Sequence, residues 1–313
     1  MEKKQNVLLR KISTMLHTRR IFMKKFAGTR LFRLLPDKTA LKILYKNVFS
    51  ETLDLKAPQT FNQKLQWLKL YNRKPEYTRM VDKYEAKKYV ADIIGEEYII
   101  PTYGVWNSFD EIDFSKLPDR FVLKCTHGSG DVVICKDKAR FDYAAAKKKL
   151  TRSLHVNYYK IGREWPYKNV KPRIIAEEYM VDSSTRELRD YKFFCFGGQV
   201  KCYKIDFDRT TEHRANYFDK SGKLIRAGET VCPPIFDKEL QLPQSMPKMQ
   251  CLAEKLSRCA PFLRVDFYDV DGNIYFGELT FFPASGFGSF EPKAFDAKLG
   301  EWLVLPRAGV NNG

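Results

Sequence analysis

The sequence of 313 residues predicts an α+β fold, in which helices precede a largely antiparallel sheet. Apolar residues recur at helical spacing between residues 60 and 93. From Phe121 onward, β-branched and aromatic runs separated by turn residues dominate instead. Two of the last predicted strands meet at Asp271-Gly272, and an Asp-Gly pair is a strong signal for an antiparallel hairpin.

Composition limits the class of protein. Hydrophobic residues make up 44% of the chain and aromatic residues 14%, which is enough for a packed core. No stretch approaches about 18 uncharged apolar residues, so we expect no membrane-spanning helix. The first residues lack the apolar core of a secretory signal, and the seven cysteines include no CxxC pair. We therefore expect a cytoplasmic protein with reduced thiols.

The first predicted element is a basic amphipathic helix over residues 5–26. Residues 1–48 hold thirteen Lys and Arg against Glu2 and Asp37, so most of the net charge of +17 lies there. Three interpretations are open: contact with an anionic membrane through residues 1–30, packing on the body or a partner chain, and nucleic-acid binding. Because the chain lacks zinc-finger spacing, an RNP-like strand and a basic region with heptads, we expect no nucleic acid. The apolar stripe of the helix consists of Leu8, Ile12, Met15, Phe22 and Phe26.

The next elements are helices. Thr60 and Gln63 form a capping-box pattern, which predicts a helix beginning at Thr60. A further helix is predicted over residues 79–93 and ends near Gly95, with Pro75 between the two. A third helical pattern covers residues 142–160, and a fourth ends the segment 241–260.

The predicted strands follow in order. They are the runs FVLKC and VVIC on either side of a turn-rich loop, PRIIAEEYM, the pair in DYKFFCFGGQVKCYKIDF, and the hairpin LRVDFYDVDGNIYFGELTF. Neither an internal repeat nor a low-complexity linker divides them.

The loop between the first two strands has the composition of a phosphate-binding turn. Lys124 closes the first strand, and Gly128 and Gly130 flank Ser129 in the turn. Glycines let backbone amides approach a polyanion, while a strand-borne lysine supplies a fixed positive charge. The pattern lacks the GK[ST] of a Walker loop. The alternative is an ordinary glycine hairpin with a surface lysine.

The last hairpin carries charged residues on one face. Arg264 and Asp266 are two residues apart on one strand, and Glu278 and Thr280 are two apart on its partner. Two carboxylates converging beside an arginine suit a magnesium ion with bound phosphate oxygens. The alternative is a cross-strand Arg–Glu surface pair with an unrelated Asp.

These two motifs and their order resemble the ATP-grasp superfamily, and more closely its TupA-like branch, associated with teichuronopeptide and capsular polysaccharide gene clusters. The resemblance covers residues 40–306. It is carried by TFNQKLQWLKLY, VDKYEAKKYV, LPDRFVLKCTHGSGDVVI, PRIIAEEYM, LRDYKFFCFGGQVK and RVDFYDVDGNIYFGELTFFP.

The resemblance implies an ATP-grasp fold, two α+β subdomains that clasp ATP, with a helical N-terminal extension. The implied boundaries are a basic helical segment over residues 1–78, a first subdomain with the glycine loop over 79–176, a second with the adenine connector and magnesium site over 177–306, and a tail over 307–313. The Rossmann-like domain that usually precedes the ATP-grasp core is missing, because residues 1–80 have a helical pattern.

The resemblance also implies roles for residues that match family motifs. Lys83, in an Asp-Lys motif, and Lys124 would contact ATP phosphates. Glu187 or Asp190 would hold the ribose, and the spacing leaves both open. The glycine loop over the phosphates would be Thr126, His127, Gly128, Ser129 and Gly130, and the adenine connector would run from Glu177 through Glu178 to Met180. His127 has two open interpretations, contact with the γ-phosphate and capping of the turn.

The phosphoryl-transfer residues follow from the same resemblance. Arg264 would stabilise the transferring phosphoryl group, Lys192 would add charge near the phosphates, and Lys83 would neutralise charge as well. Asp266 and Glu278 would bind Mg²⁺. Thr280 stands where many ATP-grasp enzymes have an asparagine ligand, which leaves the number of magnesium ions open.

The function implied is an ATP-dependent carboxylate–amine ligase that releases ADP. ATP and Mg²⁺ would serve it, and its substrates would be a uronic acid or peptide carboxylate of a surface polysaccharide precursor and an amine from an amino acid or amino sugar. Two alternatives stay open. A glycosyltransferase-type enzyme would use the DxD triplet Asp269–Asp271, and a nucleotide-binding protein without turnover would fit the weak ligand Thr280.

Overall fold

The computed structural model describes residues 29–183, 187–208 and 211–307. The predicted helix over residues 5–26 lies outside these ranges and stays a prediction. The helices are α2 (Arg30–Leu34), α3 (Asp37–Phe49), α4 (Phe61–Tyr71), α5 (Glu76–Val81), α6 (Glu85–Ile94), α7 (Tyr143–Leu154), α8 (Tyr158–Gly162), α9 (Met246–Ser257) and α10 (Ala294–Trp302). The strands are β1 (Thr102–Trp106), β2 (Phe121–Cys125), β3 (Val133–Cys135), β4 (Ile174–Glu178), β5 (Asp190–Phe196), β6 (Gln199–Phe207), β7 (Arg214–Asp219), β8 (Leu224–Ile225), β9 (Gly228–Glu229), β10 (Phe262–Val270), β11 (Asn273–Thr280) and β12 (Phe290–Glu291).

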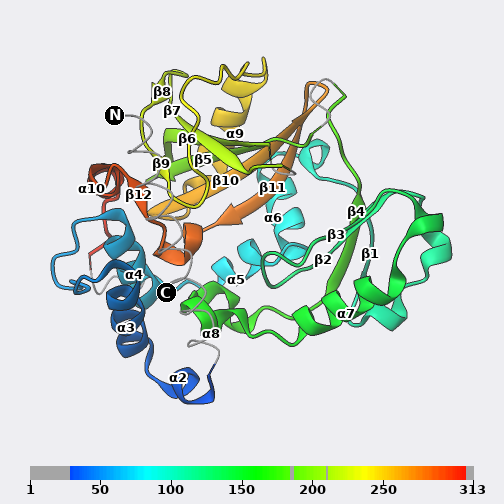
Figure 1. Cartoon of the computed structure of the whole chain (residues 1–313), viewed down its shortest axis with the longest axis horizontal. Helices are drawn as coiled ribbons and strands as arrows, with labels where there is room; N and C mark the ends of the chain where they lie inside the picture. The colour runs from blue at the N-terminus through cyan, green and yellow to red at the C-terminus, as the bar shows by residue number, and fades with distance from the viewer. Residues whose placement is uncertain (1–28, 184–186, 209–210, 308–313) are drawn as a thin grey trace.

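The larger sheet is antiparallel and has the order β11-β10-β5-β6-β7-β8 (Figure 1). Helix α9 packs against β10, β5 and β6, and α5 and α6 contact β11. Alternate residues of β5 and β10, such as Phe193 and Val265, are fully buried in this core. The other face carries polar side chains such as Lys192 and Asp266 together with buried phenylalanines such as Phe194, so both faces of these strands are covered.

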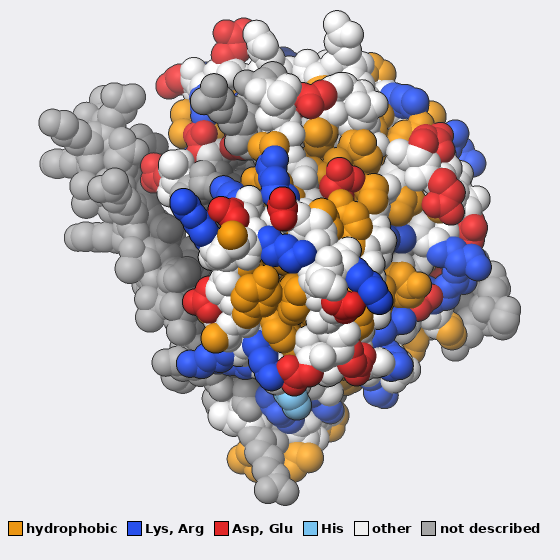
Figure 2. All heavy atoms as spheres, turned by 90° about the vertical axis from the view of Figure 1, so that its right-hand side faces the viewer, with side chains coloured by type: hydrophobic (Ala, Val, Ile, Leu, Met, Phe, Trp, Pro, Cys, Tyr) orange, Lys and Arg blue, Asp and Glu red, His pale blue; other side chains and the backbone are white. Residues whose placement is uncertain are grey.

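The smaller sheet is also antiparallel and has the order β1-β4-β2-β3. Its core is separate from the larger one and is closed by α7, through Ala146 and Leu150. Figure 2 shows the side of the molecule that carries this sheet, where hydrophobic side chains lie among charged ones. Ile134 lies on the edge strand β3 and is 51% exposed, and Val132 lies just before this strand and is 41% exposed.

The N-terminal helices form a third cluster. Leu41, Leu44 and Val48 of α3 pack with Phe287, which follows the last strand of the larger sheet. This arrangement agrees with the prediction of a helical segment before the ATP-binding motifs. None of the described helices is long and apolar enough to cross a membrane.

Most predicted elements are present. The capping box is confirmed, because Thr60 Oγ1 accepts from the Gln63 amide at 3.3 Å and the Gln63 side chain accepts from the Thr60 amide. The Asp-Gly hairpin is confirmed, with Asp271 and Gly272 both at positive φ, as a two-residue turn requires.

The continuous helix predicted over residues 79–93 is wrong. The structure has α5 and α6 instead, with a break at Asp82–Tyr84. Asp82 Oδ1 accepts from the Tyr84 amide at 2.9 Å and so begins a new helix, while the Lys83 amide donates to the Thr126 carbonyl at 3.0 Å. The segment 142–160 is similarly divided into α7 and α8.

Candidate active site

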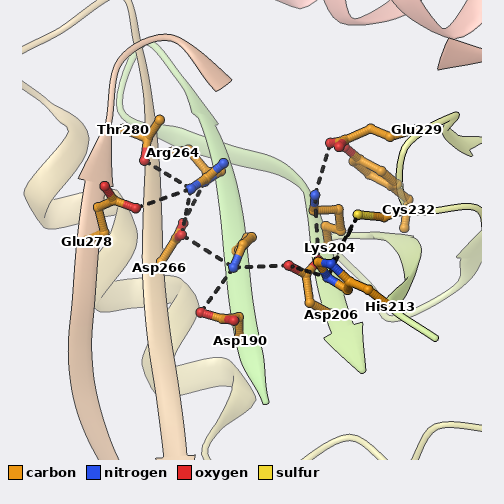
Figure 3. A network of polar contacts seen from close by, with 12 residues as sticks. Asp190, Lys204, Asp206, His213, Glu229, Cys232, Arg264, Asp266, Glu278 and Thr280 are labelled. Atoms are coloured by element: carbon orange, nitrogen blue, oxygen red, sulfur yellow. Dashed lines mark hydrogen bonds and ion pairs between the residues drawn. The ribbon is translucent and has the colours of Figure 1, made fainter. Parts of the chain in front are cut away.

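A row of charged side chains crosses one face of the larger sheet (Figure 3). Glu278 of β11 pairs with Asp266 of β10, Asp266 pairs with Lys192 of β5, and Lys192 pairs with Lys204 of β6. Residues paired directly across antiparallel strands share a face, so these four side chains lie side by side. The strand register therefore builds the row.

Arg264 contacts all three predicted metal ligands. Its Nε and Nη2 donate to the two oxygens of Asp266 at 2.7 Å each, and Nη2 also donates to Thr280 Oγ1 at 3.0 Å. Glu278 Oε2 lies 3.7 Å from Nη2. The predicted common face of these residues is confirmed. Burial alone would lower the pKa of Arg264, but Asp266 and Glu278 raise it overall, so the guanidinium stays charged.

A bulge in β11 aims Glu278 at this point. The register shifts between Asp266 and Phe267, so that Gly277 is the extra residue. A Cβ at Gly277 would meet the Asp266 carbonyl and the Tyr268 ring at 3.1 Å each. Only glycine fits this close approach without displacement of a neighbour, and bulges are frequent beside active sites because they redirect side chains.

The oxygen donors fit magnesium in chemistry. Two carboxylates and a hydroxyl are hard ligands, and Mg²⁺ usually takes one or two protein carboxylates with substrate phosphates and water completing its shell. Within residues 29–183, 187–208 and 211–307, no cluster of three or more His, Cys, Asp or Glu could hold a metal ion alone. Because Arg264 occupies both Asp266 oxygens here, it would have to yield one of them to a metal ion.

Lys192 lies at the centre of the row and is buried. Its Nζ is 3.0 Å from Asp190, 3.2 Å from Asp206 and 3.6 Å from Asp266. Burial would lower the pKa of Lys192, but these three carboxylates raise it above its ordinary value. Lys192 is therefore a charged hub that joins the predicted metal ligand Asp266 to the predicted ribose candidate Asp190.

The row continues beyond every residue selected from the sequence. Lys204 Nζ is 3.0 Å from Glu229 and 3.5 Å from Asp206, and the Tyr217 hydroxyl donates to Glu229 at 2.6 Å. A signal was present for two of these residues, because Lys204 and Asp206 alternate on β6 as Asp190 and Lys192 do on β5. Glu229 lies in the short strand β9, for which no pattern was recognised.

A cysteine and a histidine end the row. His213 Nε2 lies 3.3 Å from Asp206, and Cys232 Sγ lies 3.4 Å from His213 Nδ1. Burial raises the pKa of the Cys232 thiol to about 11, with Lys204 opposing this effect. The thiol is therefore protonated near neutral pH and is not an activated nucleophile.

The smaller sheet carries a second charged cluster. One carboxylate oxygen of Glu177 on β4 forms an ion pair with Lys124 of β2, and the other oxygen is 2.8 Å from Lys87 Nζ of α6. Although burial raises the pKa of Glu177, Lys124 and Lys87 together hold it below its ordinary value. Lys87 was not selected from the sequence. It also donates to the Ile100 carbonyl at 2.6 Å, which fixes α6 to the chain before β1.

The Asp-Lys motif is joined to the glycine loop. The Lys83 amide bonds to Thr126, as described above, and its Nζ donates to the Gly128 carbonyl. Asp82 Oδ2 is 2.8 Å from Arg173 Nη2, and the backbone carbonyl of Arg173 accepts from the Thr126 amide. The structure thus brings Lys83 and the loop together, as the resemblance implies.

Within the loop, Gly130 has a φ of +86° and open space around its Cα, so a backbone approach to a ligand is free there. His127 is buried beneath the loop, and burial lowers its pKa, with Asp131 opposing the effect. Its ring is therefore neutral near pH 7. Its Nδ1 has no hydrogen-bond partner among the described residues.

Tyr158 lies between the loop and the hairpin. A Cβ at Gly128 would be 3.5 Å from the Tyr158 ring, so the ring packs under the loop. Burial raises the pKa of Tyr158, and the negative charges of Glu164 and Glu278 raise it further.

The remaining predicted residues lie at the end of β4 and in the segment before β5. Glu187 is 2.8 Å from Arg189 and accepts from the Asp208 amide at 3.1 Å, whereas Asp190 belongs to the Lys192 cluster. The Glu178 amide donates to the Pro101 carbonyl at 3.1 Å, and Met180 follows the strand. The choice between Glu187 and Asp190 stays open.

The family model described as TupA-like ATPgrasp matches residues 63–304. The chain belongs to the TupA-like ATP-grasp family. This membership confirms the predicted family and ATP-grasp fold. No curated protein matches the chain.

Solved structures of ATP-grasp ligases are similar in part to this TupA-like protein. The ligase PsnB complexed with minimal precursor, Mg and ADP is 13% identical over 78% of this chain and 62% of its own, with a TM-score of 0.37. The D-alanine–D-alanine ligase of Bacillus anthracis complexed with ATP is 15% identical over 84% and 72%, with a TM-score of 0.40. The phosphoribosylamine–glycine ligase of Thermotoga maritima is 14% identical over 66% and 48%, with a TM-score of 0.39. The chain spans about three fifths of the length of the PsnB chains that it matches.

Proposed function

We propose that this TupA-like ATP-grasp protein is an ATP-dependent carboxylate–amine ligase. The observation that supports this most directly is the cluster of Arg264, Asp266 and Glu278 on one face of the larger sheet. Such an arrangement suits phosphoryl transfer, in which catalysis consists of positioning and neutralising charge. It offers no activated nucleophile, and this reaction needs none.

Some of these residues would bind ATP, and others would neutralise charge during phosphoryl transfer. Lys83, Lys124 and the backbone of Thr126–Gly130 would bind the phosphates, and the chain from Glu177 to Met180 would hold the adenine edge. Asp266, Glu278 and Thr280 would hold Mg²⁺, which when bound supplies positive charge to the phosphate oxygens. Arg264 would turn from Asp266 toward the transferring phosphoryl group, and Lys192 would hold Asp266 in place and oppose burial, which raises the pKa of Asp266.

The reaction would proceed in two steps. A carboxylate oxygen of the acceptor attacks the γ-phosphorus, a P–O bond forms, and the bond to ADP breaks. The amine then attacks the carbonyl carbon of the acyl phosphate, the C–N bond forms, and inorganic phosphate leaves as the amine loses a proton. Closure of the loop over the site would exclude water and so protect the acyl phosphate from hydrolysis.

The proposed acceptor is a uronic acid or peptide carboxylate of a surface polysaccharide precursor, and the donor is an amino acid or amino sugar. This part rests on the resemblance to the TupA-like family. Uronic acids and acidic peptides should be screened for carboxylate-dependent ADP release in the presence of MgATP. Hydroxylamine should replace the amine and yield a hydroxamate, because it captures acyl phosphates. ADP release that needs no carboxylate, or release of nucleotide from a sugar nucleotide instead, would contradict the proposal.

The glycosyltransferase alternative depends on Asp269 and Asp271. Asp269 accepts from Ser245 Oγ and from the Gly272 amide, and Asp271 accepts from Ser183 Oγ at 2.5 Å. Both carboxylates thus stabilise the hairpin turn and its neighbours. No observation favours a second function over the ligase.

A further inference from the structure

Helix α2 carries two exposed leucines, and helix α3, which follows it directly in the chain, carries three exposed lysines. Leu31 and Leu34 of α2 are 80% and 77% exposed. Apolar side chains of this size are rarely left so exposed when nothing covers them. In Figure 1, α2 forms the lower tip of the molecule, away from both sheets.

A stripe of lysines extends the surface along α3. Lys38, Lys42 and Lys46 are spaced four residues apart, so they lie on one side of the helix, and all three are exposed. The opposite side of α3 is buried in the cluster with Phe287. Within the described ranges, no carboxylate is paired with any of these three lysines.

The one acidic residue of α2 and α3 is turned away from this surface. Asp37 lies 2.8 Å from Arg73 and 3.2 Å from Arg163, and it accepts from the Tyr159 hydroxyl at 2.7 Å. Burial would raise the pKa of Asp37, but Tyr159 and the two arginines hold it below its ordinary value. These contacts also fasten the start of α3 to the body, so the surface is held rather than loosely attached.

We propose that this surface, made of Leu31, Leu34, Lys38, Lys42 and Lys46, docks the protein on an anionic lipid bilayer. The leucines would enter the headgroup boundary, and the lysines would face the negatively charged headgroups. Because the Asp37 side chain faces the body, the charged residues of this surface are all cations. Their positive charge is complementary to an anionic bilayer. Paired apolar tips match its acyl boundary, which neither a nucleic acid nor a purely acidic protein surface offers. The proposal does not depend on the ligase reaction.

The test uses the full chain and vesicles of two compositions. Co-sedimentation at low salt with vesicles of phosphatidylcholine and about 30% phosphatidylglycerol should exceed that with pure phosphatidylcholine and should fall as salt rises. Residues 1–28 are basic as well, so variants must locate the effect. One variant, Leu31→Ser with Leu34→Ser, removes the exposed apolar side chains. The other, Lys38→Gln with Lys42→Gln and Lys46→Gln, removes the positive charges.

A matched control changes three exposed lysines on the smaller subdomain, Lys116→Gln, Lys136→Gln and Lys148→Gln, and has the same net charge as the lysine variant. We expect the lysine variant to lose about a hundredfold in vesicle partitioning, because each of the three lysines contributes roughly a fivefold change. The control should lose little, and the leucine variant should lose binding although its charge is unchanged. Thermal melts should show all variants folded, because every substituted residue is exposed.

Three results would overturn the proposal. One is equal loss in the lysine variant and the control, which would mean that binding depends on net charge alone. Another is unchanged binding of both α2–α3 variants, which would place the contact in residues 1–28. The third is tighter binding to duplex DNA than to anionic vesicles, lost in the same variants, which would make the surface a nucleic-acid site.

Discussion

The two sheets carry charged clusters of opposite net charge. On the smaller sheet, one buried carboxylate, Glu177, lies between two lysines, and Lys83 is bonded to the adjacent loop. On the larger sheet, three cations share one network with five carboxylates (Figure 3). The first cluster has an excess of positive charge and suits a polyanion, whereas the second has an excess of negative charge and suits a cation.

Under the proposed function, one ligand would relieve both excesses. A nucleotide triphosphate would bring negative charge to the lysines around Glu177, and its metal ion would bring positive charge to the carboxylates of the larger sheet. Separate hydrophobic cores under the two sheets allow each cluster to be positioned by its own packing. The comparison therefore predicts that substitutions on the two sheets have different consequences.

The largest effect is expected at the centre of the larger sheet. Lys192→Met should leave three buried carboxylates without their shared cation and destabilise the fold by on the order of 3–5 kcal/mol. Chemical unfolding should show this, with Lys201→Met on neighbouring β6 as the control, because Lys201 bonds to Gln199 and, among the described residues, to no carboxylate. Similar stabilities for the two variants would mean that the network is not a structural unit.

The second effect concerns activity rather than stability. Glu278→Gln keeps the side-chain volume but removes a hard anionic ligand, and Glu278 is exposed enough, at 32% of its side chain, for the fold to tolerate the change. We expect magnesium-dependent ATP turnover to fall by about a hundredfold or more. Glu301→Gln, a surface substitution of equal charge, is the control and should have no effect. Wild-type turnover by Glu278→Gln would make the hairpin structural.

The third prediction separates the two lysines that contact Glu177, Lys124 of β2 and Lys87 of α6. Lys124→Met should weaken ATP binding by roughly 1.5–3 kcal/mol without weakening adenosine, because the lost contact is to phosphate. Lys87→Met should instead lower the melting temperature, since Lys87 also bonds to Ile100 and Thr102. Calorimetric titrations with ATP and adenosine check the first effect, and thermal melts check the second. Equal losses of ATP and adenosine in Lys124→Met would place Lys124 away from the phosphates.

The parts of this picture that sequence could predict are those set by local patterns. The Asp-Gly turn predicts the hairpin, but a regular register counted from that turn would set Asp266 opposite Gly277. The bulge at Gly277 shifts the register by one residue and brings Glu278 opposite Asp266, and residue spacing alone does not predict this. The contact of Lys204 with Glu229 depends on how β6 lies against β9, and that placement comes from long-range packing. The break at Asp82 was missed because apolar spacing continues across it, while the bond from Lys83 to Thr126 that favours the break is non-local.

The smallest effect is expected from His127, in the glycine loop next to the positively charged cluster of the smaller sheet. Burial lowers its pKa from 6.5, Lys83 contributes to this shift, and Asp131 opposes it. The unfolded chain therefore takes up a proton at a higher pH than the folded protein does, and stability is lost as pH falls below 6.5. His127→Gln should flatten the decline of the melting temperature between pH 7 and 5.5, whereas His155→Gln, an exposed control, should leave it unchanged. MgATP should lessen the decline in the wild type, because phosphate charge beside the loop favours protonated His127. An unaltered slope in His127→Gln would show that the acid sensitivity of the fold originates elsewhere than beneath the glycine loop.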